Sequence, residues 1–286
     1  MKYIDLHVHS NISDGSCTPE EVIALAKKKN LAAVTLTDHE SIAGNKAAAE
    51  AAAKLGVEFI PGMEMSVDYA ERRLHIVSLG FDAENPTFKK LYKKIRFIKE
   101  SKMDELISGI QEQGVAISRA LVAPFVINHI DRYAIMRYLV SLHLYDHAQP
   151  IWDYYINPVV AKLGLSYNVT AAEALPAIHE AGGVTSLAHF HKKIGLGDLN
   201  RDAQEAVIVQ LKSLGLDGME QYYPNYTDED AVFAHAMIDK YDLIPTGGTD
   251  FHGTNRPEID LGTGLDNNIK IPYSFYATIE KRCANK

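Results

Sequence analysis

Residues 3–16 read YIDLHVHSNISDGS and end an apolar strand with two histidines and a nearby aspartate. Successive side chains of a strand point to opposite faces, so Asp5, His7 and His9 share one face and the apolar residues between them share the other. Two imidazoles at the end of a strand, followed by a turn that carries Asp14, are typical of metal ligands. A pair of hydrogen-bonded surface histidines gives the same short pattern. The rest of the chain has to decide between a metal site and such a surface pair.

The composition is that of an ordinary globular protein. The chain has 286 residues, of which 47% are hydrophobic and 23% charged, enough for one large α/β domain or a domain with an insertion. The net charge of −8 argues against a broad nucleic-acid-binding surface, and we expect no binding of duplex DNA. The only cysteines, Cys17 and Cys283, predict neither a disulfide framework nor a thiolate metal site. Because no signal-peptide pattern and no membrane-length apolar run is visible, we expect a cytoplasmic protein.

Short apolar runs alternate with amphipathic helical patterns. After the first strand, within residues 3–16, we predict strands over residues 32–39, 57–67, 74–81, 182–190, 215–223 and 243–253. Helices are predicted over residues 18–30, 41–56, 170–183 and 202–215. Thr18 is the expected N-cap of the first helix with Pro19 after it, and Thr170 with Glu173 predicts a capping box. Pro176 should shorten or kink the helix that contains it.

The alternation of strands and helices predicts a parallel sheet with helices outside it. Seven strands with ligand-type residues at their carboxyl ends favour a barrel, because barrel sites are built at those ends. Residues 99–168 break the alternation and are predicted to be an inserted helical subdomain, with 1–98 and 169–286 forming the barrel domain. The insert holds the aromatic residues Tyr133, Tyr138, Tyr145, Trp152, Tyr154, Tyr155 and Tyr167. They either line a substrate pocket or form the core of the helical lobe.

Candidate metal ligands gather at the ends of the predicted strands. They are His7, His9, Asp14, His39, Glu64, His75, His189, Asp250 and His252. Histidine and carboxylate together, without thiolates, suit Zn, Mn or Fe at hydrolytic sites. Nine such groups exceed what one ion can use, so the sequence predicts two or three neighbouring divalent ions, with Glu64 as a possible bridge.

The motifs HVH with SDG, TDH, the strand-borne Glu64, LHIVSLGF, LAHF and GTDFHG resemble those of the PHP (polymerase and histidinol phosphatase) family. The likeness covers almost the whole chain, and the helical insert resembles that of the stand-alone phosphoesterase branch. This resemblance implies a distorted seven-stranded (β/α) barrel. It also implies three ligand sets, in which Glu64 is shared: His7, His9, Glu64 and Asp250; Glu64, His75 and His189; and Asp14, His39 and His252.

Two positions depart from the family pattern. Family members often have Ala-His-Pro where this chain has Ala188-His189-Phe190, followed by His191, which is either an extra surface residue or a perturbation of the site. Relatives often carry an arginine two residues before a histidine in the insert, where this chain has Ile127-Asn128-His129. A phosphate-binding arginine is therefore expected to be missing.

The ligand chemistry predicts hydrolysis of phosphate esters, by attack of a metal-activated hydroxide on phosphorus. We predict Glu64, Asp250 and His129 as catalytic residues, and His129 and Arg256 as substrate contacts. His129 or a metal-bound water would protonate the leaving group. Asp5 and Asp38 could orient ligand imidazoles, or make ordinary strand-end hydrogen bonds.

The expected substrates are small and nucleotide-type: mononucleotides, nucleotide 3′,5′-bisphosphates or short 5′-phosphorylated oligonucleotides. The alternatives are a histidinol-phosphate or sugar-phosphate phosphatase, an amidohydrolase-type enzyme, which also opens with His-x-His, and a non-catalytic metal-binding module. Amidohydrolase sites commonly use a lysine on a middle strand, where this chain has Glu64 and His75. A module without catalysis would be expected to have lost ligands, and none is lost.

Overall fold

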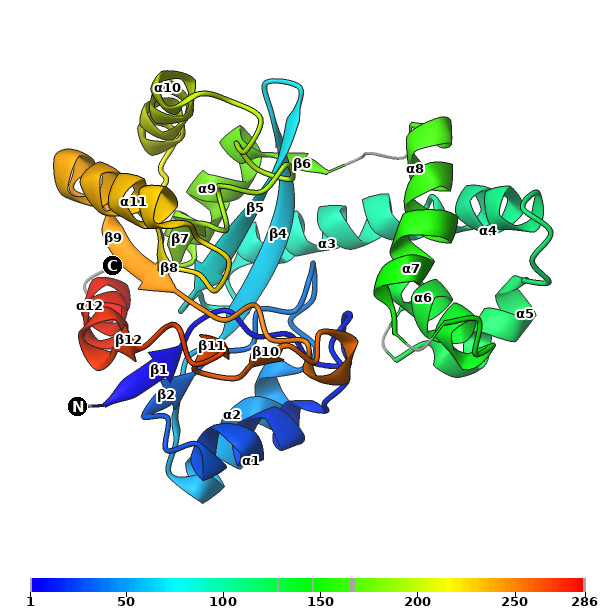
Figure 1. Cartoon of the computed structure of the whole chain (residues 1–286), viewed down its shortest axis with the longest axis horizontal. Coiled ribbons are helices and arrows are strands. Elements are labelled where there is room, and N and C mark those ends of the chain that lie inside the picture. The colour runs from blue at the N-terminus through cyan, green and yellow to red at the C-terminus, as the bar shows by residue number, and fades with distance from the viewer. Residues whose placement is uncertain (1, 128, 146, 165–167, 285–286) are drawn as a thin grey trace.

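The structure, a computed structural model, is an α/β fold in which helices surround the sheets (Figure 1). It describes residues 2–127, 129–145, 147–164 and 168–284, so Asn128 and Tyr167 lie outside the described residues. The strands are β1 (Tyr3–Asp5), β2 (Ala33–Val34), β3 (Glu58–Phe59), β4 (Gly62–Tyr69), β5 (Arg72–Leu79), β6 (Val169–Thr170), β7 (Val184–Leu187), β8 (Gly218–Tyr222), β9 (Ile244–Gly247), β10 (Ile259–Asp260), β11 (Gly264–Leu265) and β12 (Ile271–Pro272). The α-helices are α1 (Pro19–Lys28), α2 (Asn45–Leu55), α3 (Pro86–Glu100), α4 (Met103–Gln111), α5 (Arg119–Val122), α6 (Arg132–Ser141), α7 (Gln149–Ile151), α8 (Asn157–Leu163), α9 (Ala171–Glu180), α10 (Arg201–Ser213), α11 (Asp228–Tyr241) and α12 (Tyr273–Ala284). Short 3₁₀ and π turns are η1 (Ala123–Phe125), η2 (Trp152–Ile156) and η3 (Gly253–Asn255).

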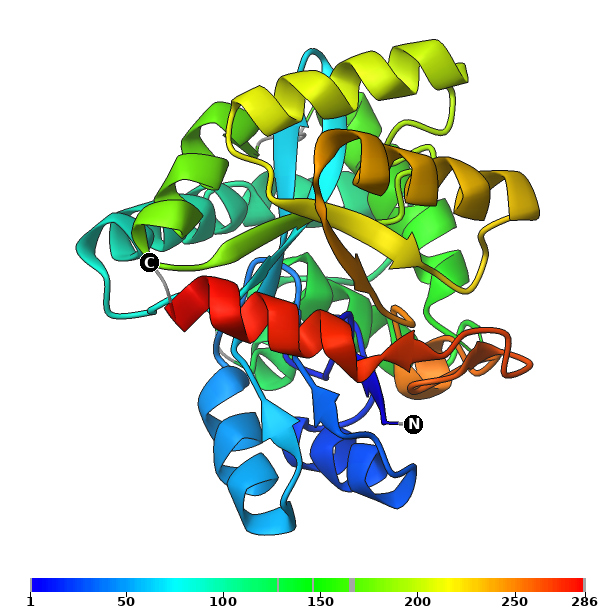
Figure 2. The same ribbon diagram turned by 90° about the vertical axis from the view of Figure 1, so that its left-hand side faces the viewer.

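Two sheets build the centre of the molecule. The six-stranded sheet has the order β6-β4-β5-β7-β8-β9 and curls, and the four-stranded sheet has the order β12-β1-β2-β3 (Figure 2). The segments that continue beyond β1, β2 and β9 join the sheets through single bridges, Val8 with Phe251 and His39 with Glu64. The carboxyl ends of β1, β2 and β9 therefore meet beside β4, where the candidate ligands lie.

The predicted parallel sheet is wrong for the strand that carries His75. β5 runs antiparallel to both β4 and β7. Ala70 and Glu71 alone join β4 to β5, with positive φ angles of 45° and 63°. Such a two-residue turn joins antiparallel neighbours, since a parallel connection needs a crossover of roughly a dozen residues. The predicted strand 57–67 also divides into β3 and β4, which belong to different sheets.

The helix starts follow the predicted caps. The Thr18 side chain accepts a hydrogen bond from the backbone N–H of Glu21 at the start of α1, and the Glu21 side chain accepts one from the backbone N–H of Thr18. Thr170 and Glu173 form the same reciprocal pair before α9. α9 is shorter than predicted, but it continues beyond Pro176 instead of ending there. No described helix combines the length and apolar character that crossing a membrane would require.

Between residues 101 and 164, the described part of the chain contains helices and no strand, as expected from the sequence. These helices lie to one side of the sheets (Figure 1). They enclose a hydrophobic cluster of their own, whose buried members all come from residues 103–159. Tyr138 is buried in it, and Trp152 and Tyr155 pack against it, whereas Tyr145 and Tyr154 are exposed. Three of the six described aromatic residues, Tyr138, Trp152 and Tyr155, therefore pack the lobe, and Tyr133 and Trp152 border a cavity beside the candidate ligands.

Candidate metal centre

The nine predicted ligands lie together at the meeting point of the two sheets. His7, His9 and Asp14 follow β1, His39 follows β2, Glu64 and His75 lie on β4 and β5, His189 follows β7, and Asp250 and His252 follow β9. Eight of them form three overlapping groups whose ligand atoms lie within 4.8 Å of one another, and His189 contacts Glu64. The structure thus brings together every residue that the sequence suggested as a ligand.

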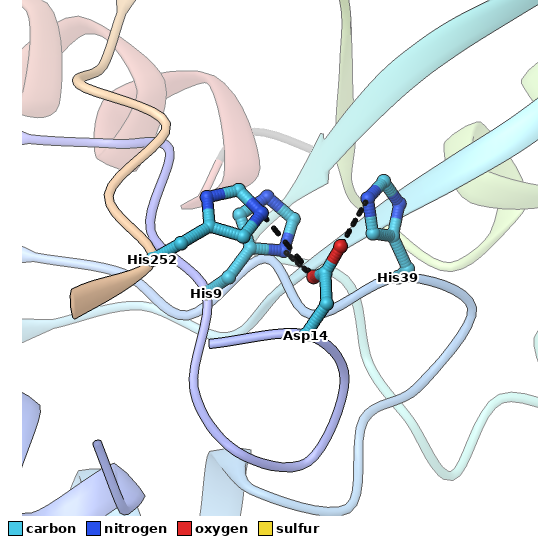
Figure 3. A group of neighbouring side chains, drawn as sticks. All are labelled: His9, Asp14, His39 and His252. Atoms are coloured by element: carbon cyan, nitrogen blue, oxygen red, sulfur yellow. Dashed lines mark ion pairs between the residues drawn. The ribbon is translucent and has the colours of Figure 1, made fainter. Parts of the chain in front are cut away.

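The first group surrounds the carboxylate of Asp14 (Figure 3). Asp14 Oδ1 lies 3.2 Å from His252 Nε2 and 3.7 Å from His9 Nδ1, and Asp14 Oδ2 lies 3.8 Å from His39 Nε2. Asp14 Oδ1 and His252 Nε2 are buried and make no hydrogen bond in spite of their proximity. Buried polar atoms that crowd together without pairing fit a shared cation, and carboxylate with imidazole is a suitable donor set for a divalent transition metal.

The second group consists of His7, His9, Glu64 and Asp250. His7 Nε2 lies 3.3 Å from Glu64 Oε2 and 3.5 Å from Asp250 Oδ1. His9 Nε2 lies 3.3 Å and 3.2 Å from the same two oxygens. The two imidazoles therefore direct their Nε2 atoms at the same pair of carboxylates, as two ligands of one ion would.

The third group centres on Glu64. Its Oε1 lies 2.9 Å from His75 Nδ1 and 3.0 Å from His189 Nε2, and its Oε2 lies 3.1 Å from His39 Nδ1. The groups differ in detail from those that the family resemblance implies. His39 joins Glu64 and His75 as well as the Asp14 group, and His9 belongs to the first group as well as the second.

Burial and charge oppose each other at these side chains. Burial disfavours the Glu64 carboxylate, but the imidazoles around it, His75 and His39 first, lower the pKa of Glu64 well below its usual value. Burial also opposes charge on His7, yet the surrounding carboxylates raise the pKa of His7 well above its usual value. At His39 burial prevails and lowers the pKa to about 3, which leaves the neutral imidazole that binds metals. The ionised form of Glu64 is thus favoured, and a divalent cation would take the place of an imidazole proton beside it.

Two candidate ligands have unusual backbone conformations. His189 and Asp250 have φ angles of 28° and 55°, which for residues with a side chain cost about 1–3 kcal/mol each. Hydrogen bonds hold them there: the backbone N–H of Asp250 donates to the carbonyl oxygen of His7 at 2.8 Å, and that of His189 donates to Glu220 Oε2 at 2.6 Å. At Gly248 a side chain would collide with His7, so only glycine allows the chain after β9 to approach this closely.

Asp5 and Asp38 support the backbone around the site; no contact of either with an imidazole ring is found among the described residues. Asp5 accepts hydrogen bonds from the backbone N–H and hydroxyl of Thr249, at 2.9 and 2.6 Å. Asp38 accepts from the backbone N–H of Ser10 at 2.8 Å and from the hydroxyl of Ser13 at 2.6 Å. Both carboxylates therefore position the loops that carry ligands.

Glu220 on β8 is a functional candidate that sequence reasoning missed. Its Oε1 lies 2.6 Å from His7 Nδ1, the ring nitrogen opposite the one that faces Glu64. Its Oε2 accepts from the backbone N–H of His189. Such a carboxylate fixes the tautomer and orientation of a ligand imidazole. The available signal was a carboxylate within an otherwise apolar strand start, Gly218-Met219-Glu220, and all three residues are buried.

Glu220→Gln is expected to lower kcat/KM about 10- to 100-fold, because an amide has one acceptor oxygen where the carboxylate serves both His7 and His189. Metal affinity should fall with it. Steady-state kinetics and a metal titration would measure both. Glu229→Gln, an exposed change on α11, is the matched control and should leave both quantities unchanged. Unaltered metal affinity in the Glu220 variant would contradict the positioning role.

A cavity of about 240 Å³ opens over the ligands. Four cations from separate parts of the chain line it: Arg73, Arg132, Lys192 and Arg256. Sequence reasoning found only Arg256. The others carry no local signal, because they reach the cavity only through the packing of β5, α6 and the loop after β7.

Arg256 and His129, the two predicted substrate contacts, lie in different surroundings. Arg256 borders the cavity and donates to Asp250 Oδ2 at 2.7 Å, and Lys192 Nζ lies 3.0 Å from the same oxygen. His129 is 41% exposed and its Nδ1 lies 3.1 Å from Glu100 Oε1. It is not among the side chains that line the cavity. The structure does not bring His129 to the ligands, and its roles as proton donor and substrate contact stay predictions.

The two departures from the family pattern have distinct structural consequences. His191 packs edge-on against the ring of Tyr226, with ring centres 4.9 Å apart, and does not line the cavity. Burial, helped by Lys192, lowers the pKa of His191 to about 4. Although an arginine is absent two residues before His129, Arg132 on α6 brings a guanidinium from the same region to the cavity.

Known proteins resemble this chain along most of its length. The chain is 28% identical to a 5′-3′ exoribonuclease of Haemophilus influenzae over 93% of this chain and 95% of that protein. It is 30% identical to a 3′,5′-nucleoside bisphosphate phosphatase of Chromobacterium violaceum over 92% of this chain and 91% of that protein. A solved structure from Bifidobacterium adolescentis, described as a candidate metal-dependent phosphoesterase, has the same fold, with a TM-score of 0.84, 24% identity and coverage of 98% and 96%. The family model for the PHP domain matches residues 5–164, more than half of the chain, and the chain therefore belongs to the PHP family.

Proposed function

We propose that this protein is a metal-dependent phosphoesterase that hydrolyses small phosphate esters of nucleotide type. Glu64 is the observation that carries the proposal, because its two oxygens lie within 3.3 Å of nitrogens from five imidazoles. A carboxylate so surrounded is suited to bridge neighbouring cations. We propose two or three divalent ions, Zn, Mn or Fe, held by the nine predicted ligands.

Ions in such a site lower the pKa of bound water and offset the charge of phosphate oxygens. The residues around the cavity have different proposed roles according to where they lie. Glu64 and Asp250 would hold the ions in place as the proposed catalytic carboxylates. Lys192 and Arg256, which both contact Asp250, lie on the cavity wall where they can pair with the phosphate. His129 remains the proposed proton donor to the leaving group, with a bound water as the alternative.

The nucleotide-type substrate is supported by two independent observations. Two of the relatives are named for RNA or nucleotide substrates, one as an exoribonuclease and one as a nucleoside bisphosphate phosphatase. Within this chain, Arg73 and Arg132 line both the main cavity and a smaller adjoining one of about 40 Å³. Cations at the junction of two cavities suit a substrate with an anionic group besides the one that reacts.

We also propose a division of the chain into a barrel domain, residues 1–98 and 169–286, and a helical insert, residues 99–168. The separate hydrophobic cluster of the helical region supports this boundary. The two bridges between the sheets support a distorted seven-stranded barrel formed by β1, β2, β4, β5, β7, β8 and β9.

A panel of phosphate esters tests the proposed function. We expect kcat/KM for AMP, adenosine 3′,5′-bisphosphate or a short 5′-phosphorylated RNA to exceed that for histidinol phosphate and a sugar phosphate by on the order of tenfold or more, since the cavity offers an aromatic wall and two cation-lined sections. A preference for histidinol phosphate or the sugar phosphate would refute the nucleotide assignment and keep the phosphoesterase. Failure to hydrolyse any of them, p-nitrophenyl phosphate included, would refute both.

A further inference from the structure

The helix that borders the cavity contains a π turn. Between Gln149 and Leu163 the helical stretch has three parts, α7, the π turn η2 and α8. In η2 the backbone N–H of Asn157 donates to the carbonyl oxygen of Trp152, five residues earlier. Pro158 follows directly and has no N–H to continue a regular ladder. Single π turns within helices are frequent at functional sites.

The π turn decides which side chains face the cavity. Trp152 and Asn157, five residues apart, both line it. Ile151 and Ile156, also five residues apart, are both fully buried in the hydrophobic cluster of the helical region. In a regular α-helix, residues five apart point about 140° away from each other. The π turn therefore keeps both isoleucines in the core and presents Trp152 and Asn157 on one wall.

This wall lies close to the candidate ligands. The Tyr133 ring stacks on His39 with centres 5.7 Å apart, and Trp152 meets Tyr133 edge-on with centres 5.5 Å apart. One aromatic ring thus separates the indole from a metal ligand. Gln149 joins the wall, and its Nε2 donates to Asp153 Oδ1 at 3.0 Å, which restricts the orientation of its amide.

We infer that Trp152, Asn157 and Gln149 recognise the nucleobase of the substrate, an inference that rests on the proposed nucleotide phosphoesterase function. The indole offers a surface on which a base stacks. Each carboxamide offers a donor and an acceptor, the pair that a base edge can match. The guanidinium carbon of Arg132 lies over the Trp152 ring, 5.6 Å from its centre, so a cation that can pair with a phosphate group lies against the indole itself.

Trp152 also packs against the hydrophobic cluster, so a test must separate base recognition from packing. The sequence provides a direct probe, because Trp152 is the only tryptophan among the 286 residues. We expect AMP to quench the fluorescence of Trp152 when it is added to the full chain. The fluorescence is excited at the red edge of the tryptophan absorption and recorded at the moment of mixing. Ribose 5-phosphate, the same phosphate ester without a base, should leave it nearly unchanged. No quenching by AMP, or equal quenching by both esters, would overturn the inference.

Kinetics supply the second measurement. Trp152→Ala should raise KM for AMP by on the order of tenfold and leave kcat/KM for ribose 5-phosphate unchanged, while Trp152→Phe restores most of the affinity. Asn157→Ala should act in the same direction with a smaller effect. Tyr154→Ala is the matched control, since Tyr154 lies in the same turn and is 62% exposed.

If Trp152→Ala lowers kcat/KM equally for AMP and for ribose 5-phosphate, the tryptophan serves packing alone and the inference is overturned. Failure of the proposed function would give a different result from failure of base recognition. A wild-type protein that hydrolyses neither ester while AMP still quenches Trp152 would refute the phosphoesterase and support the base site.

Discussion

Glu64→Gln is expected to reduce kcat/KM by on the order of a thousandfold and to lower the metal content of the purified protein at the same time. Both Glu64 oxygens face imidazoles, Oε1 towards His75 and His189 and Oε2 towards His39 among others. Glutamine keeps the size of the side chain, but it replaces one oxygen by an NH₂ group, which cannot bind a cation, and it removes the negative charge. Steady-state kinetics with elemental analysis of the same preparation would measure the two losses together.

Two controls accompany this variant. Glu71→Gln changes a residue on the exposed turn between β4 and β5, the strand pair that carries Glu64. This variant should change neither activity nor metal content. His129→Ala should leave the metal content intact and alter only turnover or KM, because His129 contacts Glu100 and no member of the ligand groups. Full metal occupancy with full turnover in Glu64→Gln would show that Glu64 is not a bridge.

Removal of metal by a chelator is expected to reduce phosphoesterase activity to about a thousandth or less, and Zn, Mn or Fe should restore it. Reconstituted protein should contain two or three ions per chain. The reason is the number of ligands, because nine side chains exceed the roughly four that a single zinc ion takes. Elemental analysis that finds one ion or none after reconstitution would contradict the prediction.

The same experiment has a stability readout. Ions that bind only the folded chain stabilise it by about 2.7 kcal/mol at a free concentration a hundred times the Kd. Thermal unfolding should therefore occur at higher temperature as metal is added. Circular dichroism of the stripped protein checks that lost activity reflects lost ions and not lost fold. Recovery of activity without any rise in Tm would argue against ions bound at the buried ligands.

Much of the site could be predicted because its signals are local. The His-x-His and Asp-x-His spacings at His7, His9, Asp250 and His252 are visible in the sequence, although β1 ends at Asp5 and β9 at Gly247, so that all four side chains lie on the segments that follow the strands. The starts of α1 and α9 were equally accessible, because a capping box depends on residues three apart, as Thr18 and Glu21 show. The helix predicted from residue 41 begins only at Asn45, where no side chain caps it. The helical character of the region between residues 101 and 164 followed from its composition and periodicity.

The direction of the strands was harder to predict from the sequence. In the turn between β4 and β5, Ala70 and Glu71 have positive φ angles. Glycine or asparagine at these positions would have indicated a hairpin in the sequence. Without that signal, the strand that carries His75 looked like another member of a parallel sheet. Its antiparallel direction is decided by pairing with β4 and β7, which depends on the whole sheet.

The sequence by itself determined which side chains are suited to bind metal and where the capped helices α1 and α9 begin, because those properties depend on neighbours a few residues away. Tertiary structure alone decided how the ligands are shared and which other residues support them. Glu220 reaches His7 across 213 residues of sequence, and Arg132 on α6 reaches the cavity only because α6 lies beside the segment after β2, where its guanidinium is 3.8 Å from Glu40. Such contacts have no local pattern, because each partner's position is set by the packing of separate elements and not by its neighbours in the chain.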